Sequence, residues 1–283
     1  LVIRKSNVIA VIIRGRGNPF FARLIKIIEP ELNEHGYEMS VHHIDTSDDE
    51  LKAAALLERE KRLKGIIFLG GRFNYHADDI AAIKVPFVCC SYTNVFGALE
   101  EGSYSSVAID DKKAARQAVE YLLQKGHKRI AALIEHTGGG SISQLRYEGY
   151  VGALQDAGLA LDASLVGCAG SFEMDDAYAA ASRLIAEAKP TALFAISDLM
   201  GVAAMKAAVD AGLRVPDDLS IIAIDGIEFS NYCVPTLTTL AQPTEALAIK
   251  SVEILAGLIE KKGLNGHVLL PTSLRQGGSV RQL

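Results

Sequence analysis

The stretch "NVIAVIIRGRGNPFFARLIKIIEPELNEHGYEMSVHHI", residues 7–44, reads as a strand, a helix and a second strand in that order. Residues 7–13 are a short run rich in β-branched side chains. Residues 20–36 carry apolar side chains at helical spacing, and residues 37–44 alternate as a half-buried strand does. Pro30 lies inside the helical stripe, so we expect a kink or a restarted turn there. The order of these elements predicts a βαβ unit and hence a parallel sheet.

The same order of elements recurs along the chain. A helix over 47–63 and continuous apolar strands over 65–71 and 85–90 complete the first half. The second half carries further strands and helices, expected as strands over 127–135, 191–197 and 219–225 and helices over 143–158, 175–188 and 198–212. We therefore predict an α/β fold of two similar, doubly wound parallel-sheet lobes.

The lobes are not expected to be contiguous in sequence. After residue 224 the chain adds one more helix and a short strand-like tail, which suggests that it crosses back between lobes. The predicted N-terminal lobe comprises 1–126 plus 243–267, and the C-terminal lobe comprises 127–242 plus 268–283.

The composition narrows the class of protein. The 283 residues are 49% hydrophobic, which is enough for a large core, and the net charge is −5. An acidic chain is poorly suited to grip nucleic acid by itself, because phosphate contacts dominate that affinity. No apolar run reaches about 18 residues, so no membrane span is expected. The start of the sequence does not resemble a signal peptide, and we expect a cytoplasmic protein.

The four cysteines do not suggest a metal site or a disulfide. They form no Cys-x-x-Cys or Cys/His spacing, and the adjacent Cys89 and Cys90 would point to opposite faces of a strand. We interpret both as core residues and predict neither a metal nor a cofactor.

An ordered set of short strings covers nearly the whole chain. These are "NPFFARL", "VPFV", "AVEYLLQKGHKRIAAL", "RYEGYVGAL", "PTALFAISD", "GLRVPDDLSIIAIDG", "PTLTTLAQP" and "LLPTSL". Together they resemble the effector-binding domain of the LacI/GalR family of bacterial transcriptional repressors. The opening "LVIRKSNVIAVI" is similar to the junction that follows that family's hinge helix.

The resemblance implies two lobes of the periplasmic-binding-protein-like type I, with a ligand cleft between them. It also implies a small-molecule effector, such as a sugar or a sugar derivative, and a homodimer. Operator DNA would be bound through an N-terminal helix-turn-helix domain that this chain lacks. A solute-binding protein of a sugar uptake system shares the fold and is the alternative. We do not expect an enzyme, because the sequence shows no nucleophile with a spaced base.

Candidate ligand-binding residues follow the strands, because ligands of open parallel sheets bind beyond the carboxyl ends of the strands. Similar sugar-binding folds carry amides, carboxylates, an arginine and aromatic rings at these places, since hydroxyls and C–H faces require them. The candidates are Asn18, Phe20, Phe21, Ser91, Asp110, Arg146, Phe172, Ser197, Asp225 and Gln242.

Several candidates have structural alternatives. Only one of Phe20 and Phe21 can join the core fully, because they point about 100° apart on a helix. Arg146 is either an inward group or a surface charge, and Asp225 is either a ligand group or a loop cap. Asp198, next to Ser197, is favoured as a helix N-cap over a ligand contact.

The chain departs from the family pattern in three places. Ser197 stands where Asn is usual, and Ser91 and Tyr92 stand where pentose-binding relatives carry Asp-Arg. Gly277 stands at the arginine of a C-terminal Arg-x-Ser pattern, for which Arg275 is the candidate substitute.

The glycine-rich residues 138–141 precede a helix and are interpreted either as an anion site or, preferably, as a flexible loop.

Overall fold

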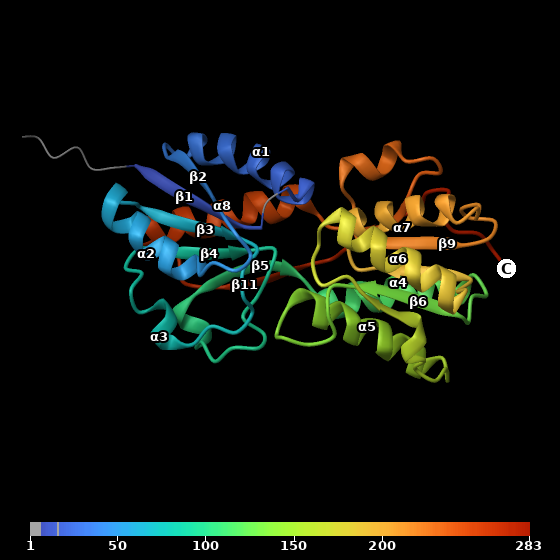
Figure 1. Cartoon of the computed structure of the whole chain (residues 1–283). Coiled ribbons are helices and arrows are strands. Elements are labelled where there is room, and N and C mark those ends of the chain that lie inside the picture. The colour runs from blue at the N-terminus through green and yellow to red at the C-terminus, as the bar shows by residue number, and fades with distance from the viewer. Residues whose placement is uncertain (1–6, 16) are drawn as a thin grey trace, which may run out of the picture. The chain divides into compact units, whose positions relative to one another are not determined.

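The computed structural model describes residues 7–15 and 17–283, and it divides into two compact units (Figure 1). Unit 1 comprises the described residues up to Ile109 together with Pro243–Leu270. Unit 2 comprises Asp110–Gln242 together with Pro271–Leu283. Each unit contains one six-stranded sheet. The predicted pair of similar, doubly wound α/β lobes is confirmed.

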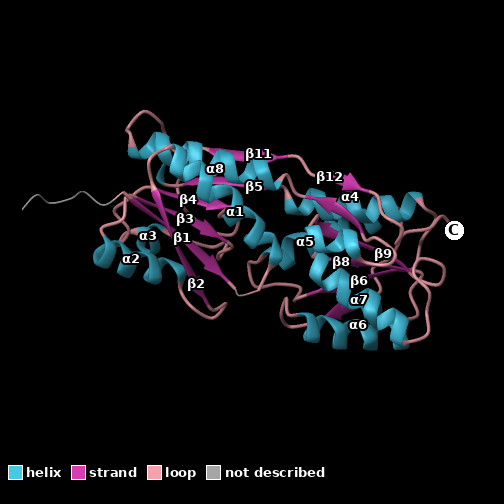
Figure 2. Ribbon diagram, turned by 90° about the horizontal axis from the view of Figure 1, so that it is seen from above, coloured by secondary structure: helices cyan, strands magenta, loops and turns pink. Residues whose placement is uncertain are grey.

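Unit 1 is built on a fully parallel sheet in the order β11-β5-β4-β3-β1-β2. Its strands are β1 (Val8–Arg14), β2 (Glu38–Ile44), β3 (Gly65–Leu69), β4 (Phe87–Cys90), β5 (Ser105–Ile109) and β11 (His267–Leu270). Its helices are α1 (Pro19–Glu34), α2 (Glu50–Lys61), α3 (Ala77–Ile80), the 3-10 helix η1 (Glu101–Ser103) and α8 (Thr244–Ile259). Helices α1 and α8 pack together, and α2 packs on β1 (Figure 2). All residues of β3, β4 and β5 are buried, as strands covered on both faces must be.

Unit 2 repeats this plan with the order β12-β10-β9-β8-β6-β7, in which only β12 runs antiparallel to its neighbour. Its strands are β6 (Ile130–Ile134), β7 (Val166–Cys168), β8 (Ala192–Ala195), β9 (Ser220–Asp225), β10 (Thr238–Ala241) and β12 (Ser273–Arg275). Its helices are α4 (Asp111–Gln124), α5 (Ile142–Asp156), α6 (Met174–Ala188) and α7 (Asp198–Asp210), with 3-10 helices η2 (Ala163–Leu165) and η3 (Glu228–Tyr232). Helix α4 packs against α5, and α6 packs against α7. Among the described residues, no helix has the length and apolar character needed to cross a membrane.

Helix α4 belongs to unit 2, whereas the sequence analysis assigned residues 110–126 to the N-terminal lobe. The reason is the close approach of α4 to α5 at Gly149. A Cβ at this glycine would lie 2.2 Å from the carbonyl oxygen of Lys112, so the two backbones meet where only glycine fits. This contact fixes α4 on the second sheet.

Helix α1 runs through Pro30 without a break, so the predicted restart of the helix is wrong. Pro30 is exposed, and the buried stripe of Phe20, Leu24, Ile28 and Leu32 extends on both sides of it along one face. Packing of this stripe holds both halves of the helix against the sheet despite the hydrogen bond that proline removes.

Cys89 and Cys90 are both fully buried in β4, which confirms their interpretation as core residues. Burial raises the pKa of each thiol to about 12. The neutral thiol is therefore the form present in the core at neutral pH.

Candidate ligand-binding site

Arg146 is the central charged residue at the carboxyl ends of the strands of unit 2. It lies one turn into α5 and is 1% exposed, so the alternative of a surface charge is wrong. Its Nε and Nη2 atoms each lie 2.9 Å from Oδ1 of Asp111. Its Nη1 atom donates to the carbonyl of Ile196 and lies 3.3 Å from Oδ1 of Asp225. Arg146 thus joins the ends of β8 and β9 to the start of α4.

Asp225 ends β9 and is 5% exposed. Gln242, which follows β10, donates from Nε2 to Asp225 Oδ1 at 2.9 Å and from its backbone N–H to the Asp225 carbonyl at 3.0 Å. The φ of Asp225 is 135°, a conformation that costs energy in a residue with a side chain. Backbone strain of this kind is typical of binding sites. Asp225 and Gln242 are therefore held in place by hydrogen bonds within the protein.

Burial changes the protonation of this cluster. It raises the pKa of Asp111 to about 6, although the neighbouring guanidinium of Arg146 opposes the shift. Burial also raises the pKa of Asp225, again against the effect of Arg146. One buried cation therefore stabilises two buried carboxylates, and each side chain depends on the others for its charge.

Asp198 is not the N-cap of α7, contrary to the favoured prediction. Ser197 is the N-cap, and its hydroxyl accepts a hydrogen bond from the N–H of Met200. Asp198 is fully buried and accepts hydrogen bonds from Ile227 N–H, Ser230 Oγ and Thr239 Oγ1, at 2.9, 2.9 and 2.5 Å. It ties α7 to the loop after β9 and to β10, next to Asp225.

The adjacent aspartates at the start of α4 have different roles. Asp110 is exposed and caps α4 by accepting a hydrogen bond from Lys113 N–H at 2.9 Å. Asp111 is the buried residue that pairs with Arg146. The sequence analysis missed Asp111, and only its neighbour was named. Phe172 lies half-buried in the loop between β7 and α6.

In unit 1, the side chains of Phe20 and Phe21 point in different directions, as expected of adjacent positions on a helix. Phe20 is 4% exposed and belongs to the buried stripe of α1. Phe21 is half-buried and reaches Gly70, where an added Cβ would lie 2.9 Å from its ring. Asn18 caps α1 by accepting a hydrogen bond from Phe20 N–H at 3.0 Å. Phe20 therefore anchors the helix, and Phe21 is the ring that remains partly accessible at the strand ends.

Ser91 follows β4 with a φ of 72°, a left-handed conformation that is uncommon for serine. Its N–H donates to the carbonyl of Val107 at 2.8 Å, and the residue is 6% exposed. The strained turn directs Tyr92 into the core of unit 1, where its hydroxyl lies 3.2 Å from that of Tyr75.

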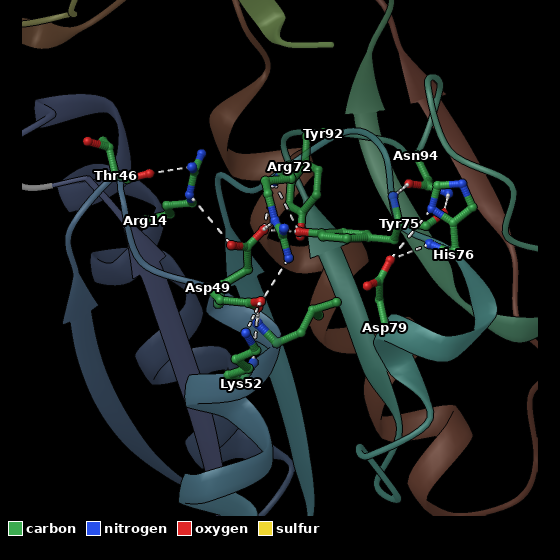
Figure 3. Close-up of polar contacts among 12 residues, drawn as sticks. Arg14, Thr46, Asp49, Lys52, Arg72, Tyr75, His76, Asp79, Tyr92 and Asn94 are labelled. Carbon is green, nitrogen blue, oxygen red and sulfur yellow. Dashed lines mark hydrogen bonds and ion pairs between the residues drawn. The ribbon is translucent and has the colours of Figure 1, made fainter. Parts of the chain in front are cut away.

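A second polar cluster of unit 1, which was not predicted from the sequence, surrounds Glu50 at the start of α2. Figure 3 labels three of its members, Arg14, Arg72 and Tyr75. Glu50 is fully buried and accepts hydrogen bonds from the Tyr75 hydroxyl and from Arg72 N–H, the latter at 2.7 Å. Its carboxylate also lies 3.5 Å from Arg14 Nε and 3.6 Å from Arg72 Nε. The cluster fixes the loops that follow β1 and β3 relative to α2.

The packing of the C-terminal tail of unit 2 explains why glycine occupies position 277, where the family pattern has arginine. A Cβ at Gly277 would lie 2.3 Å from the carbonyl oxygen of Thr236, so this backbone cannot accommodate a larger residue there. Arg275 instead donates to the carbonyls of Gly226 and Ile227, both at 3.2 Å. Arg275 therefore holds the loop that follows Asp225.

The chain is similar to known proteins in both sequence and structure. A family model described as a periplasmic binding protein-like domain matches residues 119–280. The HTH-type transcriptional regulator MalR of Clostridium butyricum is 37% identical over 278 residues, which cover 96% of this chain and 82% of that protein. The HTH-type transcriptional repressor CytR of Escherichia coli (strain K12) is 31% identical over 281 residues, covering 99% and 81%.

Solved structures agree with these relatives. A complex of the transcriptional regulator CelR with cellobiose superimposes with a TM-score of 0.84 at 26% identity, covering 98% of this chain and 85% of that chain. A LacI family transcriptional regulator from Mycobacterium smegmatis gives a TM-score of 0.81 at 29% identity, covering 97% and 99%.

The two parallel sheets, with buried polar groups at their carboxyl ends, define a ligand-binding domain of the periplasmic-binding-protein-like class. The chain belongs to the LacI family of bacterial transcriptional regulators and corresponds to the ligand-sensing domain of such a regulator. The relatives are transcriptional regulators, which confirms this interpretation over a solute-binding protein of an uptake system.

Proposed function

We propose that this chain senses a small hydroxyl-rich effector, a sugar or a sugar derivative, at the carboxyl ends of its parallel strands. The residues proposed to form this site are Asn18, Phe20, Phe21, Ser91, Asp110, Arg146, Phe172, Ser197, Asp225 and Gln242. Within this set, Phe21 supplies the ring face, and Asp225 and Gln242 supply hydrogen-bonding groups. Phe20, Asn18, Ser197 and Asp110 support these contacts by anchoring and capping the adjacent helices.

The observation that carries the proposal is the buried constellation of Arg146, Asp225 and Gln242. A buried charged group is costly unless it is paired, so its presence at a strand end calls for a reason beyond stability. Carboxylates and amides held in fixed positions are the groups that recognise sugar hydroxyls. The CelR structure was solved with cellobiose, and a LacI family regulator from Enterococcus faecium was solved with ribose.

The proposed output is a change in operator binding. The effector binds one conformation of the domain more tightly than another, and this difference in affinity shifts the population. We further propose that the protein acts in the cytoplasm as a homodimer, that it binds operator DNA through a helix-turn-helix domain, and that it has no enzymatic activity.

A thermal-shift screen of sugars tests the effector site, because a ligand that binds only the native state raises the melting temperature. Asp225→Asn keeps the size of the side chain and removes its charge. We expect it to weaken the binding of the sugar found in the screen at least about tenfold, as loss of a charge-assisted hydrogen bond does. Asp217→Asn, which removes an exposed carboxylate paired with Arg214, is the matched control and should bind as the wild type does.

Equal affinity in Asp225→Asn and the control would disprove this site. Arg146→Ala is a poor test, because it leaves Asp111 and Asp225 as unpaired buried charges and destabilises the fold by about 3–5 kcal/mol.

A further inference from the structure

We infer that the effector is uncharged and rich in hydroxyl groups, and that it carries neither a phosphate nor a carboxylate. This inference rests on the proposed function and narrows its ligand class. It follows from the way in which the arginine side chains at the strand ends are already paired. Arg14, Arg72, Arg146 and Arg275 are each already paired with a carboxylate of the protein, and five of the helices that follow strands already have a side-chain cap.

In unit 2 the guanidinium of Arg146 is buried and already forms ion pairs with two carboxylates. Two of its nitrogens face Asp111, and the third faces the Ile196 carbonyl and Asp225. An incoming carboxylate or phosphate would have to displace one of these buried partners and leave it as an unpaired buried charge, which is strongly unfavourable.

The surroundings of Arg146 also carry more acids than bases. Asp111, Asp198 and Asp225 are all buried here, and Arg275, 3.8 Å from Asp198, is the second cation of the group. Arg275 is further occupied by the carbonyls of Gly226 and Ile227. Three carboxyl groups thus face two guanidinium groups, so neither arginine lacks a carboxylate partner.

Arg14 and Arg72, the two described arginines at the carboxyl ends of strands in unit 1, are also paired (Figure 3). Arg14 lies beside Glu50 and donates to the Thr46 carbonyl. Arg72 lies between Glu50 and Asp49, with its Nη2 3.1 Å from Asp49 Oδ1. The two guanidinium charges are therefore balanced by two carboxylates, one of them fully buried.

The helix N-termini are the second observation, since free N-terminal amides commonly bind phosphate. Five helices that follow strands carry a side-chain oxygen on these amides. The caps are Asn18 on α1, Asp49 on α2, Asp110 on α4, Ser141 on α5 and Ser197 on α7.

A backbone amide of the glycine-rich loop before α5 is also hydrogen-bonded within the protein. Gly140 N–H donates to the side-chain carbonyl of Gln144 at 3.0 Å, and Ser141 caps the helix. The interpretation of residues 138–141 as an anion site is therefore disfavoured. A carboxylate has about four acceptor positions, so Asp225 can accept a hydrogen bond from a ligand hydroxyl while it stays paired with Arg146.

Matched pairs of sugars test the inference on the whole chain by calorimetry and thermal shift. Each pair contains an uncharged sugar and its anionic counterpart: glucose with glucose 6-phosphate and glucuronate, ribose with ribose 5-phosphate, and cellobiose and maltose with their 6′-phosphates. We expect the bound sugar to be an uncharged member, and its anionic counterpart to bind at least about tenfold more weakly, the effect of about 1.4 kcal/mol.

A variant that removes the buried carboxylate partner of Arg14 and Arg72 tests whether their pairing causes the preference for an uncharged sugar. Glu50→Gln keeps the shape of the buried side chain but removes the carboxylate that faces Arg14 and Arg72. We expect the preference for the uncharged sugar to fall at least threefold, with no change in the control Asp217→Asn. If Glu50→Gln does not fold, Asp49→Asn is measured instead, because Asn still caps α2 while Arg72 loses an ion pair.

The outcomes separate the two proposals. Tighter binding of a phosphorylated or uronic sugar than of its uncharged partner overturns this inference and leaves the proposed function standing. An unchanged preference in Glu50→Gln overturns the role of paired arginines in unit 1. If no member of any pair binds, the proposed function fails, and this inference fails with it.

Discussion

Asp198 is a carboxylic acid held in the interior of unit 2 by three hydrogen-bond donors. Burial raises its pKa to about 7, and the nearby charge of Asp225 adds to the shift. The folded protein therefore binds a proton more tightly at this position than the unfolded chain does. The stability that this proton contributes is fully present below about pH 4, declines as the pH rises, and is lost above about pH 7.

The variant Asp198→Asn tests this pH dependence, because an amide cannot titrate. We expect the variant to be less stable than the wild type at pH 5, since it cannot accept the same hydrogen bonds. The deficit should shrink by pH 8, where the wild type has lost the contribution of its proton. Urea unfolding of both proteins at the two pH values gives the difference, and a deficit independent of pH would contradict the raised pKa of Asp198.

Single residues show how far the candidate site can be predicted from sequence. An inward orientation was one of two alternatives for Arg146, because its place after a strand, early in a helix, is local information that does not by itself exclude a surface charge. Asp111 was missed because a pair of adjacent aspartates at a helix start does not reveal which one is buried. The packing of α4 on α5 decides that, through a contact between residues 35 positions apart. Glu50 was missed for the same reason, since its partners lie on three separate segments.

At the scale of elements, the pairing of α4 with α5 supports the arginine cluster. The two helices approach closely at Gly149, and this approach brings Asp111 of α4 to Arg146 of α5. Gly152 lies one turn further along α5, and an added Cβ there would meet only Arg116 Nη1, at 3.9 Å. Gly149 is therefore required for the close packing of the two helices, whereas Gly152 has room for a side chain.

Gly149→Ala and Gly152→Ala form a matched pair of variants. We expect Gly149→Ala to destabilise the protein by about 1–3 kcal/mol, because the methyl group forces the helices apart. Gly152→Ala should stabilise it by up to about 1 kcal/mol, because alanine favours the helix and has room. Thermal unfolding of both variants tests the pair. Equal effects would show that the helices do not meet at Gly149.

Elements with strong periodicity could be predicted, and short ones could not. The buried runs of β3, β8 and β9 stand out in the sequence because every residue is apolar or nearly so. Strand β5 contains two serines, β7 has three residues and β10 contains two threonines, so none gives a clear pattern of its own. Their neighbours in the sheet, rather than their own side chains, make them strands.

For the whole molecule, the recurrence of the strand and helix order was enough to predict two lobes. The point where the chain first passes between units was not, because it depends on which sheet α4 covers. The structure places that point between Ile109 and Asp110 rather than after residue 126.

The proposed homodimer is a prediction at this scale. Unit 2 exposes three large apolar side chains within six residues of the loop after β9: Phe229 is 54% exposed, Tyr232 75% and Val234 94%. Aromatic and aliphatic groups gathered in this way are typical of protein interfaces, and a second copy of the chain is the partner that we propose for them.

We expect sedimentation velocity to show a dimer at micromolar concentration and Tyr232→Glu to shift it toward the monomer. Val209→Glu, at a 60% exposed position on α7, is the control and should remain dimeric. A monomeric wild type would refute the dimer, and a dimeric Tyr232→Glu would place its interface elsewhere on the chain.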